Sequence, residues 1–209
     1  MKGIFLAFTA ILASALMIKA DFRIVFLNTP TVSVNGKEMK VNDVFPEKSA
    51  IKWSSPKQAM KIVDTQSGKQ RLIVAEQYQK SKAADVMSFI KGVKHLSSRG
   101  SANNVVTLRN MMTDHFYFTD SISFTTDFKT DRDHFFFVSY EYEGEEINKR
   151  IHNHNGTFSI SGDIFTIDGK QIPQFDVILS LHYLDLKANK STLITDGMYV
   201  TMIPEELSD

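Results

Sequence analysis

The chain of 209 residues is expected to be mainly β, and two patterns in its sequence lead to that expectation. Apolar and polar residues alternate along HFFFVSYEYEG (134–144) and FDVILSLHYLDL (175–186), as in strands with one face in a core. Asn-Gly and Asp-Gly pairs, which are typical of tight turns, separate other strand-like segments. We therefore predict a small β-barrel or sandwich module with one amphipathic helix, followed by an antiparallel β-sandwich.

The first module begins with short strands. Phe22, Ile24 and Phe26 alternate with their neighbours, and the following segment VSVNGKEMKV turns at Asn35-Gly36. This pair tolerates positive φ at both central turn positions, which predicts a hairpin. Three further strand-like segments follow, AIKW, AMKIVD and RLIVA. Strands of this length and spacing fit a small barrel or sandwich.

The hydrophobic period changes at Glu76. From there to Val93 the apolar residues recur at helical spacing, so we expect one amphipathic helix. The segment SSRGSANN (97–104) has the Ser, Gly and Asn of a linker. We predict a basic domain at 21–96, a linker at 97–104 and an acidic, aromatic-rich domain at 105–209, with strands throughout the second domain.

The N-terminus has the layout of a signal peptide at residues 1–20. Lys2 precedes an apolar run from Ile4 to Ile18, which ends near Ala20, the expected cleavage position. Ala15 is a second possible cleavage position, and an uncleaved anchor is the alternative. No cysteine is present, which excludes disulfides and a lipidated cysteine. We expect export to the periplasm or cell surface, not as a lipoprotein, with no transmembrane segment in the mature chain.

The charge differs in sign between the two predicted domains. Residues 21–100 carry 14 Lys and Arg against 7 Asp and Glu, whereas residues 101–209 carry 8 against 17. This division favours two domains that attract each other or different partners. Nucleic-acid binding is not expected, because it needs a clustered basic face.

His152 and His154 are the candidate metal ligands. Residues two apart in a strand point to the same side, so both imidazoles can face one ion. A tight site needs a third and usually a fourth ligand. Strand pairing would have to supply them from His134, Asp163, Asp168 and His182. The simpler interpretation is a pair of solvated histidines beside a hairpin turned at Asn155-Gly156, and no cofactor is expected.

Sequence motifs of known catalytic sites are absent. The chain has no Gly-x-Ser-x-Gly, no His-Glu-x-x-His and no phosphate-binding glycine loop, so we expect no enzyme. Phe135, Phe137 and Tyr199 lie opposite the predicted core faces and are candidate ligand-binding residues. Coverage of that face by a second sheet or by the other domain is the alternative.

Three functions remain open. The favoured one is a non-catalytic exported binding or assembly protein of the bacterial envelope, whose partner is another envelope protein or an envelope polymer. A glycan-binding module using the exposed aromatic residues is the second. A metal-dependent hydrolase using His152 and His154 is the third.

One segment resembles a known group. VSVNGKEMKVNDVFPEKSAIKWSSPKQAMKIVDTQSGKQRLIVAEQY (32–78) has a Gly-Lys hairpin, a Trp some residues later and a Gln-Ala-Met-Lys strand. In these features it resembles the N-terminal part of uncharacterised exported proteins of Bacteroidetes-type bacteria. The resemblance implies no activity, and no functional residue is carried over from it.

Overall fold

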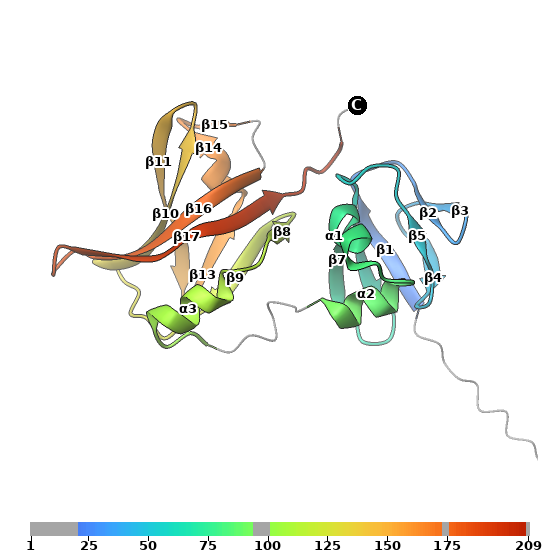
Figure 1. The fold of residues 1–209 in the computed structure, drawn as a ribbon, viewed down its shortest axis with the longest axis horizontal. Helices are drawn as coiled ribbons and strands as arrows, with labels where there is room; N and C mark the ends of the chain where they lie inside the picture. The colour runs from blue at the N-terminus through green and yellow to red at the C-terminus, as the bar shows by residue number, and fades with distance from the viewer. Residues whose placement is uncertain (1–20, 94–100, 173–175, 208–209) are drawn as a thin grey trace, which may run out of the picture.

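A computed structural model describes residues 21–93, 101–172 and 176–207, and Figure 1 shows their arrangement. The protein is mainly β, as predicted, and is built from several antiparallel sheets. Within the described residues none of these sheets closes into a barrel, so the barrel option for the first module is not found. The predicted signal peptide at 1–20 lies outside the described residues.

The N-terminal half contains a four-stranded and a three-stranded sheet. The four-stranded sheet has the order β4-β1-β6-β7, and its strands are β1 (Asp21–Leu27), β4 (Val44–Pro46), β6 (Ala59–Asp64) and β7 (Gln70–Val74). The three-stranded sheet has the order β3-β2-β5, and its strands are β2 (Val32–Val34), β3 (Lys37–Met39) and β5 (Ile51–Lys52). Asn35 and Gly36 turn between β2 and β3 with φ of 51° and 78°, which confirms the predicted hairpin.

Strand β1 departs from the simple alternation expected of it. Phe22 and Ile24 are buried, but the register against β6 shifts between Ile24 and Phe26. Leu27 is therefore buried, whereas Phe26 is only partly covered. A β-bulge of this kind adds a residue to one strand and changes which side chains face the core.

The single amphipathic helix predicted from Glu76 onward is wrong, because the segment forms two helices. Helix α1 spans Ala75–Ser81 and ends at Lys82, which is left-handed with φ of 53°. Helix α2 spans Val86–Gly92, and the carboxylate of Asp85 accepts the amide hydrogen of Ser88 as its N-cap. The helical apolar spacing persists across the break because both helices face one core cluster.

The C-terminal half begins with a helix that the sequence interpretation missed. Helix α3 spans Val105–Met111 where a strand was expected. The side-chain oxygen of Asn104, within the predicted linker, accepts the amide hydrogen of Thr107 and caps the helix. Leu108 and Met111 are buried in the C-terminal core. The linker prediction falls partly on residues 94–100, outside the described residues.

The remaining strands form a five-stranded, a three-stranded and a two-stranded sheet. The five-stranded sheet has the order β11-β10-β16-β17-β8, and its strands are β8 (Phe116–Phe118), β10 (His134–Tyr142), β11 (Glu145–Arg150), β16 (Asp176–Asp185) and β17 (Lys190–Met202). The three-stranded sheet has the order β12-β13-β9, and its strands are β9 (Ser121–Thr125), β12 (His152–His154) and β13 (Thr157–Ser161). A 3-10 helix (Gly162–Phe165) leads into the hairpin of β14 (Thr166–Ile167) and β15 (Lys170–Gln171). Strand β8 pairs parallel with β17, which departs from the all-antiparallel expectation.

Phenylalanine rings join the five-stranded sheet to the three-stranded sheet. Phe136 of β10 stacks on Phe158 of β13 with ring centroids 4.4 Å apart, and Phe158 stacks on Phe124 of β9 at 5.2 Å. All three side chains are fully buried. The face of β10 that carries Phe136 is therefore the core face, and the opposite side of the five-stranded sheet is available for another role.

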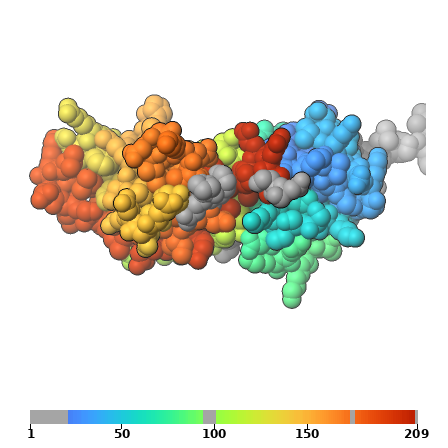
Figure 2. All heavy atoms as spheres, turned by 90° about the horizontal axis from the view of Figure 1, so that it is seen from above, coloured from blue at the N-terminus to red at the C-terminus, as the bar shows by residue number. Residues whose placement is uncertain are grey.

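The two halves meet at a small junction. Ala59 and Val74 of the four-stranded sheet form a buried cluster with Ile203, which follows β17. The amide of Leu207 donates to the carbonyl of Asn28 at 2.9 Å, so the C-terminal segment lies against the N-terminal half, as Figure 2 shows in red and blue. Among the described ion pairs, Lys61–Asp120 joins the halves. The buried part of this junction is thus apolar, although the sequence suggested attraction between opposite charges.

Candidate functional site: the outer face of the five-stranded sheet

The candidate site is the side of the five-stranded sheet opposite Phe136, here called the outer face. Its side chains lie in rows, because residues in register on neighbouring antiparallel strands stand side by side. The central row contains Asn148 of β11, Ser139 of β10 and Ser180 of β16, which are paired in that order. These side chains are polar and small, so the larger side chains of this face lie in the rows on either side of them.

The first flanking row runs across four strands. Arg150, Phe137, His182 and Leu193 are successive partners on β11, β10, β16 and β17. The rings of Phe137 and His182 stack with centroids 4.7 Å apart and an interplanar angle of 9°. Leu193 remains 44% exposed. Burial lowers the pKa of His182, which favours its neutral form beside these apolar neighbours.

The second flanking row lies on the other side of the central row. Glu146 pairs with Glu141, and Ile178 pairs with Tyr199. Ile178 is 47% exposed and Tyr199 is 50% exposed. Together with Leu193, these side chains expose apolar surface on both sides of the polar central row.

Arg150 is held at one end of the outer face. Its guanidinium carbon lies 3.9 Å from the centroid of the Phe135 ring, and its Nη2 donates to the carbonyl of Asp131 at 3.2 Å. Within the part of the chain that the structure describes, no ion pair links Arg150 to a carboxylate. Its charge is therefore available to a partner.

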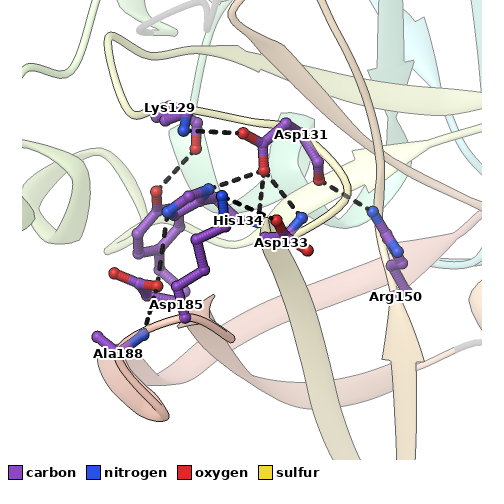
Figure 3. A network of polar contacts seen from close by, with 9 residues as sticks. Lys129, Asp131, Asp133, His134, Arg150, Asp185 and Ala188 are labelled. Atoms are coloured by element: carbon purple, nitrogen blue, oxygen red, sulfur yellow. Dashed lines mark hydrogen bonds and ion pairs between the residues drawn. The ribbon is translucent and has the colours of Figure 1, made fainter.

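A polar network fixes the loop that holds Arg150 (Figure 3). His134 Nδ1 lies 2.7 Å from Asp131 Oδ1, and His134 Nε2 lies 3.5 Å from Asp185 Oδ1. Lys129 Nζ lies 3.0 Å from Asp131 Oδ2. The contacts with His134 and Lys129 hold the pKa of Asp131 well below its usual range. The network thus keeps the carbonyl of Asp131 in place as the acceptor for Arg150.

A second polar cluster lies where the outer face meets the N-terminal half. His115 stacks on Tyr117 with centroids 4.0 Å apart, and its Nε2 lies 2.7 Å from Thr201 Oγ1. The Tyr117 hydroxyl donates to Glu76 of α1 at 3.3 Å. Burial lowers the pKa of His115 and raises that of Tyr117. This cluster joins β8 and β17 to helix α1 and limits how far the outer face extends.

The three aromatic residues proposed from the sequence lie on the outer face, but they differ in accessibility. Phe135 is partly covered by Arg150, and Phe137 by His182, whereas Tyr199 is half exposed. The sequence interpretation missed Ile178 and Leu193. The alternation in FDVILSLHYLDL already places Ile178 opposite the buried Leu179, which is the signal that was available.

The histidine pair proposed as metal ligands lies on a different sheet. His152 and His154 are both exposed on β12, and His152 Nε2 lies 3.3 Å from Asp163 Oδ2. His154 Nε2 lies 2.9 Å from the side-chain nitrogen of Asn155. In the described ranges, no three or more His, Asp or Glu side chains come together as a group that could hold a metal ion. Asn155 and Gly156 form the expected turn, with φ of 48° and 72°.

No protein family, curated protein or solved structure matches this chain. Of the helices that the structure describes, none has both the length and the apolar character needed to cross a membrane. The chain is a mainly β protein whose five-stranded sheet exposes Ile178, Leu193 and Tyr199 on one face.

Proposed function

We propose that this is a non-catalytic exported binding or assembly protein of the bacterial envelope that acts through protein–protein contacts on the outer face. The observation that carries the proposal is the exposure of Ile178, Leu193 and Tyr199 on one side of one sheet. Exposed apolar side chains that gather on one face of a protein often mark interaction sites. The signal-peptide layout of residues 1–20 and the absence of cysteine support a periplasmic or cell-surface location.

The composition of the outer face fits a protein partner. Tyr, Phe and Arg are enriched in protein interfaces, and this face presents Tyr199, Phe137 and Arg150. A glycan-binding site instead needs open ring faces on which a sugar can lie. Arg150 lies over the ring of Phe135, and Phe137 stacks against His182, so both rings already have a side chain against one face. A protein partner is therefore the better match than an envelope polysaccharide.

The two hydrophobic cores support the proposed domain organisation. One cluster gathers buried residues between Phe22 and Phe89, and the other gathers residues between Ala102 and Met202. We propose that they belong to an N-terminal domain at 21–96 and a C-terminal β-sandwich domain at 105–209. In this arrangement the C-terminal domain carries the binding face, and the N-terminal domain docks beside it through the junction.

The proposal is tested by photo-crosslinking in cells that export the protein. A photoreactive amino acid is placed at Leu193 and, as the control, at Val44 of β4, because both side chains are 44% exposed. Protein adducts that form at position 193 and not at 44, and that Tyr199→Glu removes, support the proposal. Equal adducts at both positions, or none at 193, contradict it. Binding of the purified protein to a glycan array, lost in Tyr199→Ala, would favour the glycan alternative.

A further inference from the structure

We propose that the outer face binds the outer face of a second copy of this chain about a two-fold axis through the central row. This inference rests on the proposed function and names the partner. Two-fold interfaces use the same surface on both copies, so that surface must be complementary to itself. The arrangement of the rows meets this requirement.

The distances along β11 set the position of the axis. Glu146, Asn148 and Arg150 point to the same side because they are two residues apart. At about 3.4 Å per residue, Arg150 and Glu146 are roughly 14 Å apart, with Asn148 midway. A two-fold axis at Asn148, perpendicular to the strands and in the plane of the interface, therefore places Arg150 of each copy opposite Glu146 of the other.

The same rotation matches the rest of the rows. The first flanking row of one copy lies over the second flanking row of the other, since the central row is on the axis. Leu193 then faces Tyr199, and His182 faces Ile178. Phe137 faces Glu141, and Leu184 faces Asp176, and these two unfavourable matches lower the expected affinity. Because the axis is two-fold, the Leu193–Tyr199, His182–Ile178 and Arg150–Glu146 contacts each occur twice in the dimer.

Charge selects this arrangement over its main alternative. If the two-fold axis ran parallel to the strands instead, the strand ends would not exchange. Because β11 is an edge strand, Arg150 of each copy would then lie over the opposite edge of the other sheet, away from Glu146. No Arg150–Glu146 pair would form, whereas the perpendicular axis forms this pair reciprocally. The C-terminal half that carries this face has 8 basic against 17 acidic residues, so long-range repulsion between copies opposes association and weakens as the salt concentration rises.

The size of the face is compatible with a weak dimer. Strand β10 has nine residues, which span about 30 Å, and the five strands span about 19 Å, using standard strand spacings. Because β11 has six residues and β8 three, the projected area is at most about 600 Å² per copy, below the roughly 800 Å² per partner of standard stable interfaces. We expect a dissociation constant on the order of 10 μM, because interfaces below the standard size are typically weak or transient.

The test is sedimentation velocity of the purified protein from about 1 to 200 μM, a range that brackets the expected dissociation constant. Wild type should convert from monomer to dimer. Leu193→Glu should abolish the dimer, and Val44→Glu, the control of equal exposure, should leave it intact. Arg150→Glu and Glu146→Arg should each weaken association about tenfold. The chain with both changes should recover most of the wild-type affinity, since the reciprocal ion pairs re-form with their charges exchanged.

Several results would overturn the inference. One is a wild-type protein that stays monomeric at 200 μM. Another is a Leu193→Glu variant that still dimerises, and a third is a double variant, Arg150→Glu with Glu146→Arg, that associates no better than the single variants. Circular dichroism of each variant separates loss of association from loss of folding. The crosslinking experiment distinguishes this inference from the proposed function. Adducts at position 193 with a different protein, together with a monomeric purified chain, would leave the proposed function standing and remove the second copy as its partner.

Discussion

Phe136 and Phe137 are adjacent on β10 but should have opposite roles, and alanine substitutions separate them. Phe136 is fully buried, with the rings of Phe158, Tyr183 and Phe128 at centroid distances of 4.4, 5.1 and 5.6 Å. Phe137 lies on the outer face against His182. We expect Phe136→Ala to damage folding and Phe137→Ala to damage association.

The magnitudes follow from burial. A buried Phe→Ala change costs about 3–5 kcal/mol, and three aromatic neighbours place Phe136 toward the upper end of that range. Phe137 loses one ring stack and part of its buried area, about 1–1.5 kcal/mol. For a protein of this size each kcal/mol lowers the melting temperature by roughly 2–4 °C. The expected decreases are therefore roughly 10–20 °C for Phe136→Ala and roughly 2–6 °C for Phe137→Ala.

Urea denaturation at about 1 μM protein, below the expected dissociation constant, measures folding without association. Sedimentation velocity at higher concentration then measures association for the same variants. Phe137→Ala should remain folded and lose most of its dimer. Equal losses of unfolding free energy for the two variants would refute the assignment of opposite faces to these side chains.

Three further predictions concern the polar network, the junction and the histidine pair. Asp131 has a pKa below the ordinary 3.8, so its stabilising contribution is present above that pH and is lost on acidification. Asp131→Asn should therefore flatten the fall in urea midpoint below about pH 4, and an unchanged fall would contradict this. Ile203→Ala should cost about 2–4 kcal/mol, because the side chain is buried in the junction. Lys61→Met should cost less than about 1 kcal/mol, since the Asp120 side chain of its ion pair is largely exposed. A larger loss for Lys61→Met than for Ile203→Ala in urea denaturation would mean that charge holds the halves together. Excess zinc should change the melting temperature of neither wild type nor His152→Ala. A zinc-dependent rise in wild type alone would support a metal site at His152.

Much of the local structure was predictable because its causes are local. The strands at His134–Tyr142 and Asp176–Asp185 follow from a period of two, since alternate side chains of a strand point to opposite faces. The turns at Asn35-Gly36 and Asn155-Gly156 follow from residues that tolerate positive φ. The failures arose where a cap or a bulge interrupted the pattern. Lys82 and Asp85 divide one apolar helical period into two helices, and the apolar spacing alone does not show such a break.

Part of the candidate site could be predicted from the sequence, and the rest required the tertiary structure. Alternation by itself placed Phe135, Phe137 and Tyr199 opposite the core, because that requires only the geometry of one strand. The tertiary structure decided which side chains stand beside them, since pairing between distant strands sets the register. The bulged register of β16 and β17 brings Leu193 beside His182 and Tyr199 beside Ile178. The pairing of β10 with β11 brings Arg150 beside Phe137. No local property of the sequence encodes these offsets, because they come from the fit of whole strands to a shared core.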